Sequence, residues 1–347
     1  MQRVYLDYNA TSPLRSEARS AMIGAMDALG NPSSVHAEGR AAKAILEKAR
    51  AQISEAIGAS GADIVFTSSA TEAAALALGG RNLAGAAIEH DAVRAYTDGA
   101  LEVSSQGAVT VTEPERSALQ LANSETGVLQ DLPEGIAVSD FTQAFGKIPV
   151  SFAWSGAEMA LISAHKLGGP KGVGALIVRQ GVDVPALIRG GGQEMGRRSG
   201  TENVIGIAGF GAAAEAAQRD LETGVWSRVE EFRNILEISL DRAAEDIIFV
   251  GKGAPRLPNT SCFIAPGWKG ETQVMQMDLA GFAVSAGSAC SSGKVKASGV
   301  LRAMGFDEGQ AAQALRVSIG PATTEEDIYR FAETWAAKYR KIRARAA

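Results

Sequence analysis

Hydrophobic positions along this chain repeat with two different periods. Residues 38–57 place isoleucine and alanine at four-residue intervals with charged side chains between them, a pattern that predicts an amphipathic helix. Residues 63–69 (DIVFTSS) form instead a short apolar run of strand length, and an alanine-rich helix is expected to open at Thr71 directly behind it. This part of the chain therefore predicts an amphipathic helix, a buried strand and a second helix, in that order.

The same alternation continues through the rest of the sequence. Further helices are expected at 15–29, 202–221, 228–245 and 296–304, and from about Thr324 onward. Further strands are expected at 109–112, 119–123, 135–140, 159–164, 174–179, 247–250, 260–264, 282–286 and 315–319. This order predicts an α/β fold with a largely parallel sheet, followed by a smaller α+β C-terminal part.

One connection is too short for this scheme. Nine residues separate Gln130 from Asp140, and some of them belong to the next strand. Parallel strands usually need a crossover of about a dozen residues or more, which normally contains a helix. We expect either strands that are not joined by a helical crossover or a sheet that lacks one of its covering helices.

Composition narrows the class of protein. The chain has 347 residues, which is typical of two or three domains. Lys and Arg number 34 and Asp and Glu number 39, and the resulting charge of −5 argues against a protein that binds nucleic acid or an anionic membrane. The sequence has neither an apolar window of membrane-spanning length nor a secretory signal at its start, so a cytoplasmic protein is expected.

The two cysteines are in different settings. Two thiols are too few for a disulfide framework or a thiolate zinc site, and the three histidines are far apart in sequence, so no metal site is expected. Cys262 lies within a predicted strand, which is typical of a buried and inert thiol. Cys290 lies in a Gly/Ser-rich segment with Lys294 and Lys296 close behind, where nearby positive charge would lower the thiol pKa. Cys290 is therefore the candidate nucleophile.

Lys166 is the first candidate for chemistry. It follows a buried strand in SAHKLGGPKGVGAL and precedes a glycine-rich loop. A lysine at a buried strand end either carries a function or extends its amine to the surface. If Lys166 carries a function, its amine could form a Schiff base with an aldehyde cofactor while neighbouring Ser, His and Gly residues bind a phosphate.

Two other strand ends carry side chains that could bind the same kind of cofactor. Asp140 ends the strand GIAVSD, with Gln143 three residues later, and a carboxylate there could keep a pyridine nitrogen protonated; a helix N-cap would explain Asp140 equally well. Ser69 and Thr71 lie at a strand-to-helix junction, where a helix N-terminus can bind a phosphate, although Ser and Thr caps are also common without a ligand.

Taken together, the motifs resemble the cysteine desulfurases of the NifS/IscS group, which are pyridoxal phosphate (PLP) enzymes of the class-V aminotransferase family. The resemblance runs in order through YLDYNATSPL, GNPSSVHAEGR, FTSSATE, ETGVLQ, SAHKLGGPKGVGAL, GGGQEMGRRSGTEN, SAGSACSS and LRVSIGPATTEEDI, and covers nearly the whole chain. It implies a fold-type-I PLP-dependent transferase with a sheet of the seven-stranded type. The implied large domain spans residues 13–217, and residues 1–12 and 218–347 form a small domain that carries the cysteine loop.

The resemblance also implies a role for each matching residue. Lys166 would be the Schiff-base lysine and Asp140 the partner of the pyridine nitrogen, while Gln143 would contact the phenolic oxygen and His90 would stack on the ring. The phosphate would be held by Ala70, Thr71, Ser163 and His165, with Thr201 reaching across from a second subunit. Ser124 stands where the family usually has an asparagine that contacts the cofactor. Arg316 and Asn123 would bind the substrate.

The implied reaction converts L-cysteine to L-alanine and leaves its sulfur as a persulfide on Cys290, with His90 as a possible proton acceptor. The expected partners are a second copy of the chain and a sulfur-acceptor protein, such as an iron–sulfur scaffold or a sulfur carrier. Two alternatives stay open. One is a selenocysteine lyase or another class-V PLP enzyme, and the other is a low-activity subunit that depends on a sulfur-transfer partner.

Overall fold

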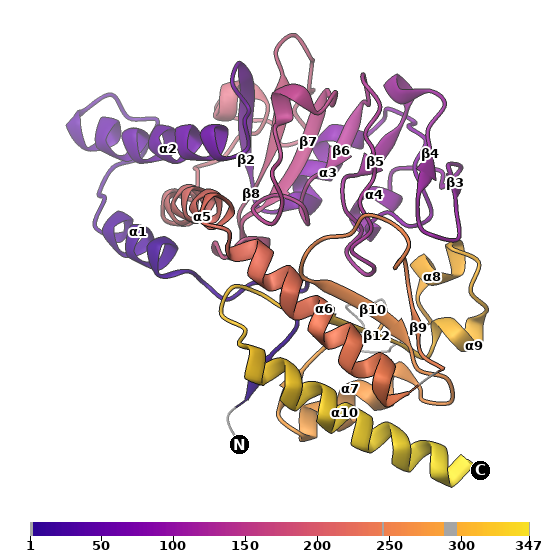
Figure 1. The fold of residues 1–347 in the computed structure, drawn as a ribbon. Coiled ribbons are helices and arrows are strands. Elements are labelled where there is room, and N and C mark those ends of the chain that lie inside the picture. The colour runs from indigo at the N-terminus through magenta and orange to yellow at the C-terminus, as the bar shows by residue number, and fades with distance from the viewer. Residues whose placement is uncertain (1–2, 245, 288–296, 347) are drawn as a thin grey trace.

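The computed structural model describes residues 3–244, 246–287 and 297–346. Cys290 therefore lies outside the described residues. The chain forms two bodies that meet face to face, one built on a large sheet and the other on a smaller antiparallel sheet (Figure 1). Each body has its own hydrophobic core.

The large sheet has five strands and confirms the predicted α/β fold with a mostly parallel sheet. In spatial order the strands are β2 (Ala62–Thr67), β8 (Gly174–Arg179), β7 (Met159–Ser163), β6 (Val138–Asp140) and β5 (Ala118–Gln120). β5, β6 and β7 are parallel, whereas β8 runs antiparallel to both β7 and β2. Isolated parallel bridges from Ala84 to Ser117 and from Ala86 to Leu101 continue the pairing beyond β5, without forming the further strands of a seven-stranded sheet among the described residues.

This topology brings several strand ends to one edge of the sheet. β5, β6 and β7 end there at Gln120, Asp140 and Ser163, and β2 ends there at Thr67 because it is parallel to β7. β8 begins at the same edge, with Gly174 paired to both Thr67 and Ser163. Residues from distant parts of the sequence therefore gather at the edge that faces the second body (Figure 1).

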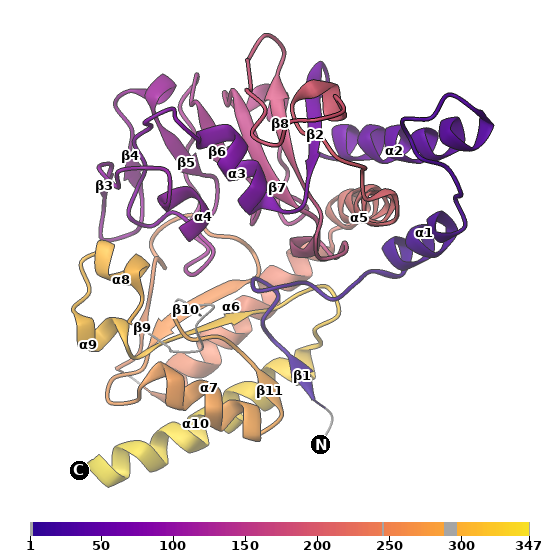
Figure 2. The same cartoon turned by 180° about the vertical axis from the view of Figure 1, so that it is seen from behind.

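Helices cover both faces of the large sheet. On one face lie α1 (Ser16–Met26), α2 (Ala37–Ala56) and α5 (Val204–Glu222), and on the other lie α3 (Ala70–Leu78) and the short α4 (Asp91–Arg94), which Figure 2 shows in front of the sheet. Gly211 of α5 lets that helix approach α2 closely, because an added Cβ would lie 2.6 Å from the Ala49 Cα. The small residues of α5 thus serve helix packing.

The short connection contains no helix, as one of the two expectations proposed. From β5 the chain passes through a turn at residues 123–127 and returns to β6 without forming one. Its place is filled by Leu132 and by Val109 and Val111, which pack against the same core as Leu119. The expected strand at 109–112 is therefore not part of the large sheet: β4 (Val109–Thr110) pairs only with β3 (Glu102–Val103) in a separate hairpin.

The second body combines the C-terminal part with the start of the chain. Its antiparallel sheet has the order β12 (Ala314–Ser318), β10 (Thr260–Ile264) and β9 (Ile248–Phe249), and the first strand β1 (Val4–Tyr5) pairs with β11 (Phe282–Ala283). The helices of this body are α6 (Val225–Ala243), α7 (Gly270–Leu279), α8 (Gly299–Ala303), α9 (Glu308–Ala311) and α10 (Glu325–Ala346). Aromatic rings pack together in its core, with Trp335 stacked on Tyr339 and meeting Phe263 edge to face.

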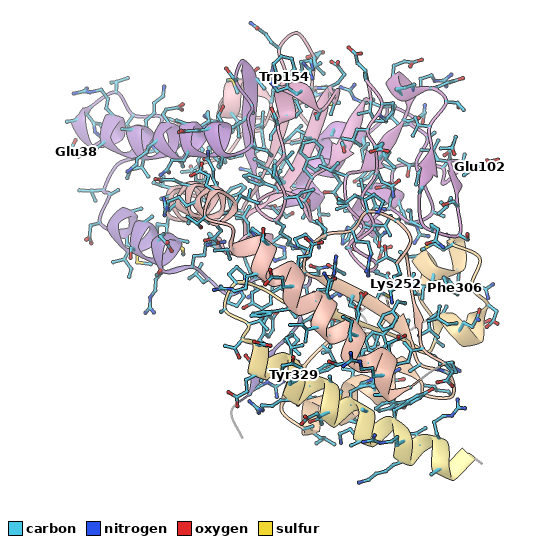
Figure 3. All side chains as sticks on the ribbon, in the orientation of Figure 1. Glu38, Glu102, Trp154, Lys252, Phe306 and Tyr329 are labelled. Carbon is cyan, nitrogen blue, oxygen red and sulfur yellow. The ribbon has the colours of Figure 1, made fainter. Side chains whose placement is uncertain are left out.

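One exposed aromatic side chain lies away from the junction of the bodies. Trp154 is 90% exposed at the top of the molecule, on the loop that enters β7 from the opposite edge of the sheet (Figure 3). Across the described residues, no helix combines the length and the apolar character that crossing a membrane requires.

Candidate active site

A cavity of about 190 Å³ opens at the edge of the large sheet where the strands end. Strand β7 leads directly into it, since Ser163 is its last residue and His165 and Lys166 follow in a single turn of 3-10 helix. Nine of the positions predicted to hold a cofactor line this one cavity: Ala70, Thr71, His90, Ser124, Asp140, Gln143, Ser163, His165 and Lys166.

One end of the cavity is the N-terminus of α3. Ser69 caps this helix, its hydroxyl accepting a hydrogen bond from the Glu72 amide at 3.2 Å, and Ala70 and Thr71 form the first turn. The free amides of a first helical turn favour an anion such as a phosphate. Gly174 is required for this arrangement, because an added Cβ would lie 2.6 Å from the Ser69 carbonyl carbon and 2.8 Å from the Ala70 nitrogen.

Lys166 places its amine between the two bodies. Its Nζ donates to the main-chain carbonyls of Asn9 at 2.6 Å and Ala10 at 3.0 Å. Burial and, secondarily, the positive charge of Arg316 lower the pKa of Lys166 to about 8. A larger fraction of this amine is therefore unprotonated near neutral pH than for an ordinary lysine, which favours attack on an aldehyde.

Asp140 lines the cavity from the end of β6 and His90 from the start of α4. One carboxylate oxygen of Asp140 accepts the Thr142 amide at 2.8 Å, and no helix begins behind it, so the N-cap explanation does not apply. His90 precedes α4, and its Nδ1 accepts the Ala92 amide at 3.1 Å, which leaves Nε2 to carry the proton of a neutral ring. His90 is thus oriented by the start of a helix.

His165 is neutral in this setting. Burial, with further contributions from Lys166 and Lys171, lowers the pKa of His165 to about 4. Its Nδ1 lies 3.2 Å from the Thr11 hydroxyl. A neutral imidazole can bind a phosphate only as a single hydrogen-bond donor, so most of the anion binding falls to the helix N-terminus and the hydroxyls.

A larger cleft of about 550 Å³ adjoins the cavity, and His90, Ser124 and Lys166 line both. Arg316 of β12 forms its opposite wall and is held by two contacts. Its Nη2 donates to Asp7 Oδ1 at 2.8 Å and its Nη1 to the Ser124 carbonyl at 3.0 Å. The buried Nε of Arg316 has no hydrogen-bond partner among the described residues.

Two predicted site residues, Asn123 and Thr201, line neither the cofactor cavity nor the cleft. Asn123 is fully buried, and its Oδ1 accepts the amides of Glu125 and Thr126, so it holds the turn that presents Ser124 and does not reach either cavity. Thr201 is exposed and lies in a separate pocket with Arg198. Cys290 is not described, but Gly287 and Ala297, described residues on either side of its segment, line the cleft.

The structure also assigns site contacts to residues that sequence reasoning left without a role. Asp7 holds Arg316 and also accepts a hydrogen bond from the Ser285 hydroxyl at 2.8 Å. Asn9 contacts Lys166, and Lys147 contacts both Asn9 and Gln143. Asp7 and Asn9 belong to the motif YLDYNATSPL. Its place among the ordered family motifs was the only sequence signal that these two residues could belong to the site.

The donor set of the cavity fits a phosphorylated pyridine aldehyde. It has an amine of lowered pKa, a carboxylate at a strand end, an imidazole, and a helix N-terminus with hydroxyl groups. No group of three or more His, Cys, Asp or Glu residues that could hold a metal ion is found in the part of the chain that the structure describes.

Comparison with known proteins agrees with this geometry. A family model described as aminotransferase class-V matches residues 4–93 and 91–331. The chain therefore belongs to the class-V aminotransferase family and is an enzyme of that class.

Individual relatives narrow this assignment to one activity class. The chain is 35% identical to the cysteine desulfurase IscS of Dictyoglomus turgidum, over 94% of this chain and 92% of the relative, and 37% identical to a cysteine desulfurase of Cereibacter sphaeroides, over 96% and 95%. A NifS-like protein from Rickettsia africae has the same fold, with a TM-score of 0.88 and 32% identity over 98% of this chain and 100% of that one. These relatives place the chain among the cysteine desulfurases, as the motifs predicted.

Proposed function

We propose that the protein is a PLP-dependent cysteine desulfurase that converts L-cysteine to L-alanine and transfers the sulfur to Cys290. The observation that carries this proposal is the position of Lys166, which lies where the cavity lined by nine cofactor positions meets the cleft lined by Arg316. A cofactor and an amino-acid substrate could therefore meet at one amine.

The residues of the cavity would each bind one part of the cofactor. The first turn of α3 and Ser163 would bind the phosphate, Asp140 the pyridine nitrogen and Gln143 the phenolic oxygen, while His90 would lie against the ring. When bound, PLP supplies an aldehyde for Lys166 and a ring that withdraws electrons from the substrate. Ser124 is shorter than the family's usual asparagine, so its contact with the cofactor would be weaker or lost.

The substrate would bind from the cleft. Arg316, which lines this cleft, would bind the α-carboxylate through its guanidinium group. Lys166 is suited to move the α-proton, since a pKa of about 8 allows the amine to accept and return a proton near neutral pH. Both groups line the same cleft, and the α-carbon would be held between them.

Sulfur transfer would need no outside oxidant. The Cys290 thiolate attacks the substrate sulfur, an S–S bond forms and the C–S bond breaks. The substrate carbon keeps the electron pair and takes a proton, which gives alanine, and the sulfur stays on Cys290 as a persulfide. The proposal is supported by Gly287 in the cleft wall, three residues before Cys290. A thiol acceptor, such as an iron–sulfur scaffold or a sulfur carrier, would then take the sulfur.

We also propose a homodimer that works in the cytoplasm. Thr201 does not line the cavity of its own chain, which supports a contribution to the site of a second subunit. Large apolar side chains are exposed on two segments, Leu29 and Val35 on the loop between α1 and α2, and Leu187, Ile188 and Met195 on the segment between β8 and α5. A reducing compartment would keep the Cys290 thiol available.

The test is alanine formation from L-cysteine by the PLP-loaded protein with a thiol reductant, beside Cys290→Ala. We expect turnover in the wild type, and in Cys290→Ala normal cofactor and cysteine binding without sulfur release. Equal sulfur release by both proteins would contradict the role of Cys290. Turnover of selenocysteine with no turnover of cysteine would favour a lyase.

A further inference from the structure

The lysine buried deepest beside the site is not the one that faces the cofactor cavity. Lys147 is 2% exposed and lies on the loop behind β6. Its Nζ donates to Gln143 Oε1 at 2.6 Å and to Asn9 Oδ1 at 3.0 Å. Among the described residues no carboxylate lies within ion-pair distance of this amine. An unpaired buried lysine is costly, so its retention calls for an explanation.

The hydrogen bond to Gln143 decides which way that amide points. The Asn9 carbonyl on one side of this amide can only accept, so the end that faces Lys147 is the oxygen, which accepts a hydrogen bond from Nζ. The nitrogen then lies on the other side, where Nε2 donates one hydrogen to the Asn9 carbonyl at 3.0 Å. Gln143 lines the cofactor cavity, and its second Nε2 hydrogen is available there.

The same amine fixes Asn9, which connects the two bodies. Asn9 Oδ1 accepts from both Lys147 and Asn259 Nδ2, the latter at 3.0 Å, and Asn9 Nδ2 donates to Thr260 Oγ1 at 2.9 Å. The Asn9 carbonyl receives the Lys166 amine at 2.6 Å. Displacement of the Asn9 side chain would therefore change the position of Lys166 as well.

We infer that Lys147 is a positioning residue of the active site, whose amine holds the Gln143 amide with its nitrogen toward the cofactor's phenolic oxygen. This inference rests on the proposed function, because that function puts a phenolic oxygen in the cavity. Two acceptors match the two N–H groups of a neutral amine, and burial together with the charge of Lys166 lowers the pKa of Lys147 in the direction that favours this form.

The test is a double-mutant cycle on cofactor binding. Lys147→Met keeps an unbranched side chain one atom shorter and removes the donor, and we expect a loss of about tenfold in PLP affinity together with a changed visible absorption of the bound cofactor. In a Gln143→Ala background, Lys147→Met should change both properties much less, because only the contact with Asn9 is then lost. Equal effects in both backgrounds, or an unchanged spectrum in Lys147→Met, would overturn the inference.

Two further variants separate positioning from folding. Ser261→Ala removes a buried hydrogen bond to Glu237 that involves neither Asn9 nor Gln143, so it should lower the melting temperature and leave the absorption spectrum unchanged. Lys147→Gln retains a donor and should recover part of the PLP affinity that Lys147→Met loses. If Lys147→Met folds poorly, Lys147→Gln still tests the inference. A wild-type protein that binds no PLP would refute the proposed function, whereas a PLP-binding wild type with an unaffected Lys147→Met refutes only this inference.

Discussion

The environment of Lys166 determines its reactivity. Burial and Arg316 lower the pKa of Lys166 from 10.5 to about 8, so roughly a tenth of the amine is neutral at pH 7. Only the neutral amine attacks an aldehyde. We expect the rate of PLP uptake by the cofactor-free protein to rise about tenfold per pH unit below pH 8 and to level off above it.

Stopped-flow absorbance after mixing with PLP would measure this profile. Lys166→Ala should show no covalent uptake at any pH. A wild-type rate that keeps rising up to pH 10 would mean that the amine behaves as an ordinary lysine and that its burial has no effect on its pKa.

Asp7 acts on the substrate through Arg316. The pair is largely buried, and loss of one partner from a buried ion pair leaves an uncompensated charge. We expect Asp7→Asn to raise the KM for cysteine about tenfold with a much smaller change in kcat, and to lower the melting temperature. A lower KM would mean instead that Asp7 competes with the substrate carboxylate.

Asp278→Asn is a matched control for Asp7→Asn. It removes the ion pair of Asp278 with Arg3, in which both side chains are more than half exposed. Exposed pairs contribute about 0–1 kcal/mol, so neither KM nor the melting temperature should change measurably.

At the scale of elements, the phosphate end depends on how closely α3 approaches β8. A Cβ on Gly174 would overlap main-chain atoms of Ser69, Ala70 and Ile162, none of which can move without shifting the helix or the strand. We expect Gly174→Ala to lower PLP affinity by about tenfold or more and to destabilise the fold by about 1–3 kcal/mol. Isothermal titration and thermal unfolding would measure the two effects.

Gly24 offers the contrasting glycine. It lies within α1, and an added Cβ would meet no atom within 4 Å. Gly24→Ala should therefore stabilise the protein by about 0.5–1 kcal/mol through its helix propensity and leave PLP affinity unchanged. A parallel loss of affinity in both variants would show that the effect at Gly174 is not specific to the α3–β8 contact.

For the whole molecule, the position of Thr201 predicts complementation between subunits. In a homodimer that shares its sites, Thr201→Ala lowers PLP affinity in both sites, and Lys166→Ala prevents covalent binding in both. A mixed dimer of the two variants should contain one site with an intact Lys166 and an intact Thr201. We expect that site to recover wild-type PLP affinity in co-expressed, doubly tagged dimers.

The control is the Thr201→Ala homodimer purified through the same tags. Equal PLP affinity in the mixed dimer and in this control would place Thr201 in the site of its own chain, or in neither site. A protein that remains monomeric in light scattering at assay concentration would contradict the shared site directly.

The sequence by itself determined the class of fold, the main elements and the family. Periodic hydrophobic positions predicted α2, α5, β2, β8 and β10 close to their observed bounds, because each buries one face or a whole strand and its local pattern records that burial. Ordered motifs predicted nine positions that line one cavity. Even the absence of a helix before β6 followed from counting residues.

Only the tertiary structure decided how the junction between the bodies works. No local pattern indicates that Asp7 holds Arg316, that Lys147 lies beside Gln143 or that Asn123 faces away from the cavity. These contacts join residues far apart in sequence, or depend on which side of a turn faces inward. The sequence could predict neither kind of contact. The burial of Lys166 and Lys147 depends on how the two bodies pack, and the pKa of each amine depends on that burial.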